Sequence, residues 1–202
     1  MGQITKTTRQ TDNRFLNMYD LETVQKTGKK SHYFMATRAD SPEKLKLYTH
    51  TDAPDGVIIF ALAGEKHDRI VLVKQYRYPI DGYIYELPAG LVEKGEDIHT
   101  AGIREMKEET GLDFMPLKVP EGYERPFFSS VGMTDESCST IYGYCTGTPT
   151  SAGEEESEEI EVVLADRKEA ARILREENVC IRAGYALPHF IADEDPFAFL
   201  AM

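Results

Sequence analysis

The chain has 202 residues, enough for one well-buried domain and a small accessory one. Charged residues make up 29% of it and the formal net charge is −12, which argues against partners such as nucleic acids or anionic membranes. Cys138, Cys145 and Cys180 form no C-x-x-C pair, so we expect no disulfide framework, no zinc site and a cytoplasmic location. Because the first 14 residues are polar and no apolar run reaches bilayer length, we expect neither a signal peptide nor a membrane span.

The N-terminal residues 1–50 are predicted to form a β-hairpin region, followed by a larger domain at 51–202. Strand-like stretches at 18–25 and 32–38 flank a turn. Because a lone hairpin is marginally stable in water, it must pack either on its own domain or on a second copy of the chain. Residues 40–54 are polar, and we predict a loop there with a short strand around 45–50.

The remaining sequence alternates strands with helices. Gly56 to Ala61 and Ile70 to Tyr76 are apolar and rich in β-branched residues, which predicts two central antiparallel strands. Further strands are predicted at 83–87, 125–130, 137–145 and 160–165, and helices at 97–110, 167–177 and 185–192. Pro188 and Pro196 are expected to interrupt the apolar tail. The pattern favours an α/β fold, an α/β/α sandwich around a mixed sheet, with an N-terminal antiparallel hairpin or small sheet.

The helix at 97–110 carries an unusual acidic face. Glu105, Glu108 and Glu109 are related by steps of three and four residues, so their carboxylates project from one side. Such like charges repel, whereas a divalent cation would turn the repulsion into ligation by oxygens of the type that Mg²⁺ prefers. The alternative is a solvated acidic face. Gly102 either weakens this helix or lets it lie close to a sheet.

The segment from Gly90 to Leu112 resembles a complete Nudix box. Its fixed positions, G-x5-E-x7-R-E-U-x-E-E-x-G-U, are matched by Gly90, Glu96, Arg104, Glu105, Glu108, Glu109 and Gly111, with apolar residues at the two remaining sites. Arg104 stands four residues before Glu108 and can pair with it. Gly111 stands where a glycine ends a helix, and we expect Gly90 to permit a tight turn after Pro88.

This resemblance implies a Nudix hydrolase and a set of metal ligands. Glu105, Glu109 and the carbonyl of Ala89 are implied to hold the metal, with Glu108 sharing or bridging it. The implied cofactor is Mg²⁺, with Mn²⁺ as the alternative. Glu86, in the segment Glu86-Leu87-Pro88-Ala89-Gly90, is implied to touch substrate, although a structural hydrogen bond explains it equally well.

Other segments are similar to the ADP-ribose pyrophosphatase branch of the family. Val73 to Arg77 matches a V-x-Q-(Y/F)-R segment whose arginine reaches the substrate diphosphate, so Arg77 is the matching residue here; the alternative is an ordinary surface arginine. Ser130 to Glu136 is similar to an S-P-G-x-x-x-E segment and implies a substrate or metal contact for Glu136. It departs from that pattern at Val131, where proline is expected.

An acidic loop at 148–157 precedes the last predicted strand. A run of acids on a loop is usually only solvated. In the enzymes that this chain resembles, however, a glutamate of this loop activates the attacking water. Glu156 and, second, Glu158 are the matching candidates for the catalytic base.

The resemblance therefore implies Mg²⁺-dependent hydrolysis of a nucleoside diphosphate sugar, ADP-ribose giving AMP and ribose 5-phosphate, by a homodimer. Val131 keeps other nucleotide sugars open, such as GDP-mannose or ADP-glucose. A second class of function is a regulatory module that binds a nucleotide without cleaving it. Such modules usually lose box carboxylates, and this chain keeps all of them.

Overall fold

The structure is a computed structural model that describes residues 2–150 and 160–201. The chain divides into two compact units. Unit 1 comprises Met1–Asp55 and Pro126–Cys138, and unit 2 comprises Gly56–Arg125 and Ser139–Met202. Each unit contains its own cluster of buried apolar side chains, so each has a core that supports its local geometry.

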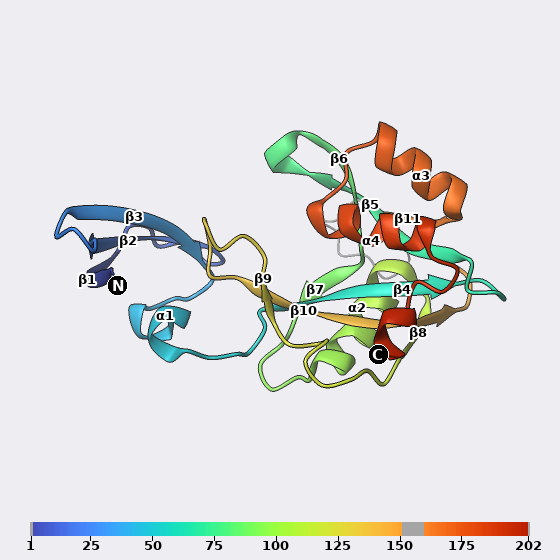
Figure 1. Ribbon diagram of the computed structural model, residues 1–202, viewed down its shortest axis with the longest axis horizontal. Coiled ribbons are helices and arrows are strands. Elements are labelled where there is room, and N and C mark those ends of the chain that lie inside the picture. Colours follow the sequence, from blue (N-terminus) through green and yellow to red (C-terminus); the bar gives the residue numbers. More distant parts are fainter. Residues whose placement is uncertain (1, 151–159, 202) are drawn as a thin grey trace. The chain divides into compact units, whose positions relative to one another are not determined.

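Unit 1 is built on a three-stranded antiparallel sheet in the order β1-β2-β3 (Figure 1). Its strands are β1 (Gln3–Arg9), β2 (Asn17–Val24) and β3 (Lys30–Thr37). The predicted hairpin is confirmed, since β2 and β3 pair in register from Asn17 with Thr37 to Val24 with Lys30. β1 was not predicted because all its residues but Ile4 are polar, and its backbone pairing with β2 is what makes it a strand.

The segment after β3 forms helical turns, so the predicted short strand around 45–50 is wrong. A 3-10 turn, η1 (Pro42–Lys44), is followed by α1 (Lys46–Thr49). Leu45, between them, is fully buried beside Tyr19 of the sheet. The turns on either side of this leucine bond its backbone N–H and carbonyl, whereas a strand here would need a pairing partner.

The larger sheet has the order β11-β5-β4-β10-β8, with β6 beside β5, β7 beside β4 and β9 beside β10. Its strands are β4 (Gly56–Ala63), β5 (Arg69–Arg77), β6 (Gly82–Glu86), β7 (Ala89–Leu91), β8 (Asp113–Pro116), β9 (Phe127–Phe128), β10 (Ser137–Thr146) and β11 (Ile160–Ala165). The two predicted central strands are confirmed as the antiparallel neighbours β4 and β5. β7 and β8 were missed, and β9 is shorter than predicted because only two of its residues pair with β10.

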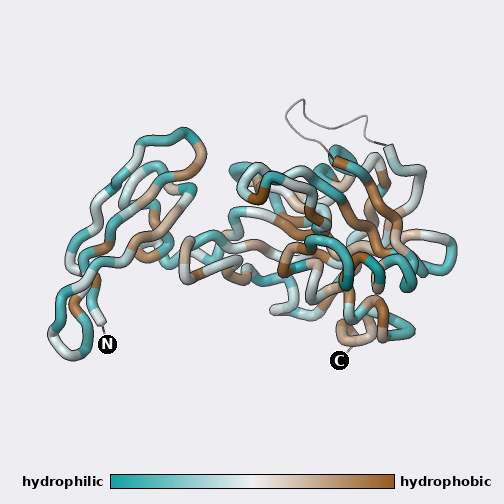
Figure 2. The backbone as a smooth tube through the Cα atoms, turned by 90° about the horizontal axis from the view of Figure 1, so that it is seen from above, coloured by the Kyte–Doolittle hydropathy of each residue, from teal (hydrophilic) through white to brown (hydrophobic). Residues whose placement is uncertain are grey.

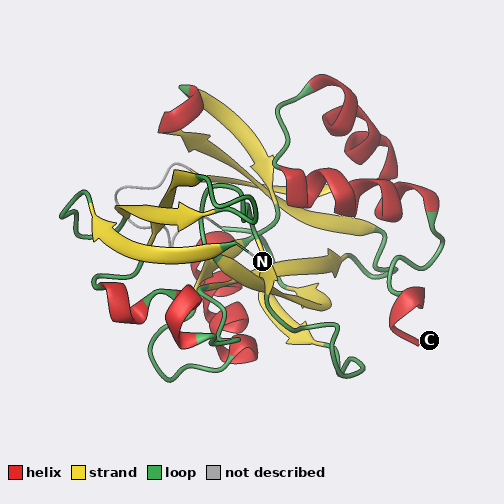
Figure 3. Ribbon diagram, turned by 60° about the vertical axis from the view of Figure 1, so that its left-hand side comes forward, coloured by secondary structure: helices red, strands yellow, loops and turns green. Residues whose placement is uncertain are grey.

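Helices cover both faces of the unit 2 sheet (Figure 3). They are α2 (Ile98–Thr110), α3 (Arg167–Glu176) and α4 (Ile181–Ala192), with short 3-10 turns η2 (Tyr78–Ile80) and η3 (Ala198–Ala201). α4 begins four residues before the predicted start, and Pro188 lies inside it without ending it. Pro188 itself is exposed, while Leu187 and Phe190 on the same helix are buried and hold it in place.

The core of unit 2 lies along its central strands, which carry the hydrophobic stretches in Figure 2. β4 is buried at every position from Gly56 to Ala63, as expected of a strand covered on both faces. Ile59 and Ala61 pack in one cluster with Met106 of α2. The sheet therefore holds the acidic helix against one of its faces. None of the helices among the described residues is long and apolar enough to span a bilayer.

Candidate functional site

The acidic helix α2 has well-defined ends. Asp97 caps its start, where its side chain accepts hydrogen bonds from the backbone N–H groups of His99 at 3.0 Å and Thr100 at 3.1 Å. Gly111 ends it with a φ of 71°, the left-handed conformation that favours glycine. The helix predicted at 97–110 is thus confirmed. Because its two ends are fixed by Asp97 and Gly111, the position of each glutamate along the helix is fixed as well.

Gly102 brings α2 close to the sheet. A Cβ atom at this position would overlap the side chain of Ile141 on β10. The close approach of helix to sheet, one of the two explanations of this glycine, is therefore confirmed. The glycine's cost in helix propensity, about 1 kcal/mol relative to alanine, is offset by this packing.

The three glutamates of the acidic face differ in exposure. Glu109 is 6% exposed, the side chain of Glu105 is 14% exposed, and that of Glu108 is 51% exposed. Glu109 therefore lies on the buried side of α2 and Glu108 at its solvent edge. Removing carboxylates from water is unfavourable unless they are hydrogen-bonded or bind a cation, so the partners of Glu105 and Glu109 decide what this face does.

Strand β7 supplies a backbone partner for the most buried carboxylate. The Ala89 N–H donates to Oε2 of Glu109 at 3.2 Å. Ala89 is itself held by strand pairing with Ile58 of β4. Ala89, whose carbonyl is a candidate metal ligand, and Glu109, predicted to hold the metal with it, are thus neighbours in space, although 20 residues separate them in sequence.

Gly90 accommodates the second carboxylate. A Cβ atom at Gly90 would overlap the carboxylate group of Glu105. Gly90 lies in β7, paired with Val57, and has no positive φ, so the predicted tight turn at this glycine is wrong. A larger residue at this position would push the Glu105 carboxylate away from where it lies beneath β7.

Arg104 binds the acidic residues of the box together. Its guanidinium donates to both carboxylate oxygens of Glu96 at 3.0 Å, to Glu105 at 2.7 Å and to Glu108 at 3.0 Å. The hydrogen bonds to Glu96, and then those to the other two glutamates, raise the pKa of Arg104. The same contact lowers the pKa of Glu96. The predicted pair of Arg104 with Glu108 is confirmed, but Glu96 is its bidentate partner, a contact that the spacing of the box does not reveal.

The donor set of this site fits a hard divalent cation. Carboxylate oxygens and a backbone carbonyl are the ligands that Mg²⁺ and Mn²⁺ accept, and the missing Cβ of Gly90 leaves the space that the Glu105 carboxylate occupies. Among residues 2–150 and 160–201, no three acidic, histidine or cysteine side chains already converge as a metal-binding group. The carboxylates of Glu105 and Glu108 instead form ion pairs with the guanidinium of Arg104.

Arg77 and Glu86, both predicted to contact substrate, contact each other. Nε of Arg77 donates to Glu86 Oε1 at 2.6 Å and its terminal nitrogen donates to Oε2 at 3.2 Å. The Glu86 side chain is 8% exposed and that of Arg77 is 47% exposed. The buried glutamate therefore orients an arginine that reaches solvent, and this bidentate pair supports the structural explanation of Glu86.

The remaining candidates lie elsewhere. Glu136 belongs to unit 1, where Arg38 binds it at 3.0 Å and 3.1 Å. This partner was not predicted, because no local pattern links the two segments. Glu156 and Glu158, the candidate bases, lie outside the described residues. Just before these residues, the Thr150 N–H donates to the carbonyl of Thr110, the last residue of the box helix, at 2.9 Å.

Comparison with known proteins assigns the family. The sequence matches the family described as NUDIX domain over residues 52–182. The chain therefore belongs to the Nudix family. The resemblance that the box predicted, including its ADP-ribose pyrophosphatase-like branch, is confirmed by relatives that carry that name.

These relatives are aligned over part of their length. An ADP-ribose pyrophosphatase of Saccharomyces cerevisiae is 45% identical over 69 residues, which cover 34% of this chain and 30% of that protein. An ADP-ribose pyrophosphatase of Bacillus subtilis is 39% identical over 77 residues, covering 38% of this chain and 40% of that one. A methanol dehydrogenase activator of Bacillus methanolicus is 32% identical over 130 residues, covering 62% and 65%. The chain thus matches about a third to two thirds of the length of these relatives.

A solved structure supports the fold over nearly the whole chain. A protein described as an ADP compounds hydrolase superposes with a TM-score of 0.65 at 16% sequence identity, covering 92% of this chain and 90% of that one. The predicted α/β sandwich of the Nudix type, with its N-terminal antiparallel sheet, is confirmed.

Proposed function

We propose that the chain is a Mg²⁺-dependent hydrolase that cleaves the diphosphate of a nucleoside diphosphate sugar, converting ADP-ribose to AMP and ribose 5-phosphate. The observation that carries the proposal is the convergence of β7 and α2, where Ala89 contacts Glu109 and Gly90 accommodates Glu105. Relatives named ADP-ribose pyrophosphatase and, in Mus musculus, ADP-sugar pyrophosphatase support this substrate class.

Glu105, Glu109 and the Ala89 carbonyl would hold the cation, with Glu108 as a sharing ligand. When bound there, Mg²⁺ or Mn²⁺ would neutralise diphosphate charge and acidify water. Glu109 is positioned for this role by the Ala89 N–H, and Glu105 by Arg104. Because Arg104 is anchored on both oxygens of Glu96, it can release Glu108 to a ligand without losing its own position.

Arg77 would bind a phosphate oxygen of the substrate. Its fork geometry suits phosphate, and the Glu86 carboxylate fixes the plane of the guanidinium through two hydrogen bonds. With 47% of the side chain exposed, Arg77 has a surface on which a ligand can bind. In this proposal Glu86 is a positioning residue that acts through Arg77.

Glu156 or Glu158 would take the proton from the attacking water. The support is the start of their loop, where the backbone of Thr150 is bonded to Thr110, the last residue of the helix that carries the carboxylates. A base must come within hydrogen-bond reach of its water.

The proposal includes a homodimer and a cytoplasmic location. Unit 1 exposes large apolar side chains, among them Phe15, Phe34, Phe128 and Met133 at 58% to 70% exposure. Such surfaces usually mark contacts with other proteins, and a second copy of the chain is the occupant proposed here. Glu136, in the same unit, is proposed as a substrate contact. Cys138, Cys145 and Cys180 are present as thiols, which is consistent with a reducing compartment.

Hydrolysis of a panel tests the function. ADP-ribose, ADP-glucose, GDP-mannose, NADH and FAD are incubated with Mg²⁺, with Mn²⁺ or with EDTA, and the products are separated by chromatography. We expect chelator-sensitive conversion of ADP-ribose to AMP and ribose 5-phosphate. Turnover of another panel member alone would reassign the substrate. Nucleotide binding with no hydrolysis under any metal would instead favour a non-catalytic regulatory module.

A further inference from the structure

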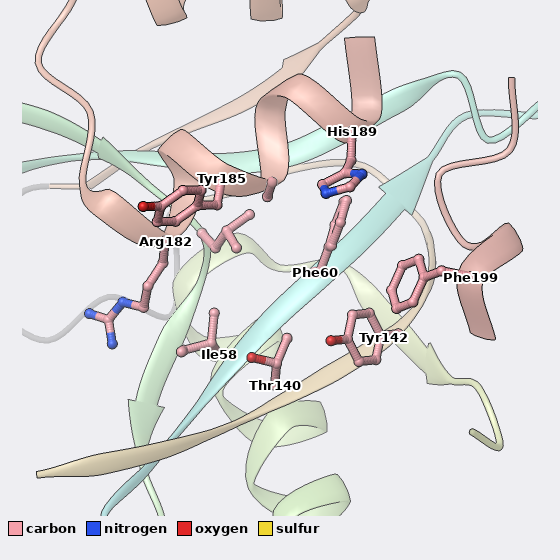
Figure 4. Close-up of a pocket in the computed structure, with 10 residues that line it drawn as sticks. Ile58, Phe60, Thr140, Tyr142, Arg182, Tyr185, His189 and Phe199 are labelled. Carbon is pink, nitrogen blue, oxygen red and sulfur yellow. The ribbon is translucent and has the colours of Figure 1, made fainter. Parts of the chain in front are cut away.

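Unit 2 contains a cavity of about 490 Å³ that the proposed reaction does not use (Figure 4). Its floor is formed by Ile58 and Phe60 of β4 with Tyr142 of β10, and its roof by Tyr185 and Ala186 of α4. Cavities of about 300 to 1,000 Å³ lined by apolar and aromatic side chains with a few polar groups are typical small-molecule sites.

The cavity lies on the face of the sheet opposite the acidic helix. Ile59 of β4 and Ile141 of β10 pack in the core cluster with Met106 of α2. Ile58 and Tyr142, each adjacent in sequence to one of these isoleucines, line the cavity instead. Because successive side chains of a strand point to opposite faces, the sheet separates a ligand in this cavity from the carboxylates of α2.

The two ends of the cavity differ in chemistry. Figure 4 shows the Arg182 guanidinium and the Tyr185 ring at one end, and Tyr142 with Phe199 at the other. Aromatic walls favour a planar ring between them, and a guanidinium favours an anionic group. Nδ1 of His189, also at the rim, lies 3.3 Å from Oδ2 of Asp193, so this histidine already has an acidic partner.

We propose that this cavity binds a planar aromatic ring that carries one anionic group, as in a nucleoside monophosphate, with the ring between β4 and α4 and the anion at Arg182. The site is additional to the proposed hydrolytic site and requires neither metal nor turnover. The buried Ile58 and Phe60, at 7% and 5% exposure, provide a rigid floor for the ring.

Methyl NMR tests the site directly, because isoleucines adjacent in sequence report on opposite faces of one strand. The whole chain, labelled at isoleucine δ1 methyl groups, is titrated in EDTA with AMP, with adenosine and with ribose 5-phosphate. We expect AMP to shift the Ile58 signal and to leave those of Ile59 and Ile141 in place. Adenosine should shift the Ile58 signal more weakly, and ribose 5-phosphate should not shift it. Shifts at Ile59 or Ile141 alone, or no shift at about 10 mM AMP, would overturn the proposal.

Single substitutions locate the ligand. Ala186→Phe fills the cavity and should abolish the AMP shift at Ile58, whereas Ile181→Phe, at an exposed position of the same helix, should preserve it. Arg182→Gln should raise the Kd for AMP about tenfold and leave that for adenosine unchanged within about twofold. Equal weakening of both ligands would overturn the assignment of the anion to Arg182. AMP binding that is lost in Arg77→Ala but retained in Ala186→Phe would place the ligand at the hydrolytic site and contradict the proposal.

Discussion

The carboxylate of Glu105 lies against the Cα of Gly90, in the space that a Cβ on this residue would fill. The two residues belong to β7 and α2, so the contact fixes how closely the strand approaches the acidic helix. This close approach places the backbone at Ala89 beside the carboxylates and is the geometric basis of the proposed metal site.

Gly90→Ala should therefore impair function more than stability. The new methyl group must displace Glu105, and a misplacement of about 1 Å at a reacting site can lower the rate about a hundredfold. We expect kcat with ADP-ribose to fall at least about tenfold and the requirement for Mg²⁺ to shift to higher concentration. Metal titrations of activity, with circular dichroism melts as the control for folding, measure both. Unchanged metal dependence would contradict the assignment of Glu105.

Gly102 of α2 and Gly184 of α4 form a matched pair for testing how α2 packs on the sheet. Gly102→Ala introduces a Cβ that overlaps Ile141, and overpacking of this kind costs about 1 to 3 kcal/mol, against a gain of about 1 kcal/mol in helix propensity. Gly184→Ala in α4 meets nothing within 4 Å and should stabilise the protein by about 0.5 to 1 kcal/mol. Urea unfolding of both variants compares them. Equal changes in the free energy of unfolding would show that α2 does not pack as closely on the sheet as the structure indicates.

The contact between Glu96 and Arg104 should make stability depend on pH. The arginine lowers the pKa of Glu96 in the folded protein below its ordinary value of 4.5. A depressed pKa stabilises the folded state at pH values above the unfolded pKa, and this contribution is lost as pH falls through the folded pKa. We expect Glu96→Gln to be less stable than the parent at pH 7, with the difference shrinking below about pH 4.5. Melting curves at pH 7 and at several pH values below about 4.5 measure it, and a difference that stays constant over this range would argue against this ion pair.

Arg77→Lys tests the phosphate contact. Lysine keeps the charge but loses the fork that binds both oxygens of Glu86. We expect the KM for ADP-ribose to rise about tenfold with a smaller change in kcat, because a binding contact has been weakened. Steady-state kinetics of Arg77→Lys and of Glu86→Gln distinguish direct binding of the phosphate from positioning of the residue that binds it. If Glu86→Gln raised KM while Arg77→Lys did not, Glu86 would be the substrate contact itself.

The sequence predicted what local chemistry determines. Asp97 and Gly111 mark the ends of α2 and the spacing of the glutamates places them on one face, so helix, face and family followed without a structure. The contact of Arg104 with Glu108 was predictable for the same reason, since four residues separate them.

Features that depend on contacts between distant parts of the chain were missed or misinterpreted. Gly90 looked like a turn residue because its sequence neighbours gave no sign of α2 above it. Leu45 lies between two helical turns rather than in a strand, and it packs in the core beneath the sheet of unit 1. The contact between Arg38 and Glu136 joins residues 98 apart in the chain, and no short pattern reports such a pair.

The central claim is that Glu109 holds a metal required for hydrolysis. The most direct measurement compares the conversion of ADP-ribose to AMP by the parent, by Glu109→Gln and by the control Glu121→Gln, which makes the same change at an exposed loop position. Glutamine can still accept the hydrogen bond from Ala89, so we expect Glu109→Gln to fold with a melting curve close to that of the parent and to lose at least about 99% of its turnover, while Glu121→Gln stays fully active. Full activity of Glu109→Gln in Mg²⁺ would contradict the account.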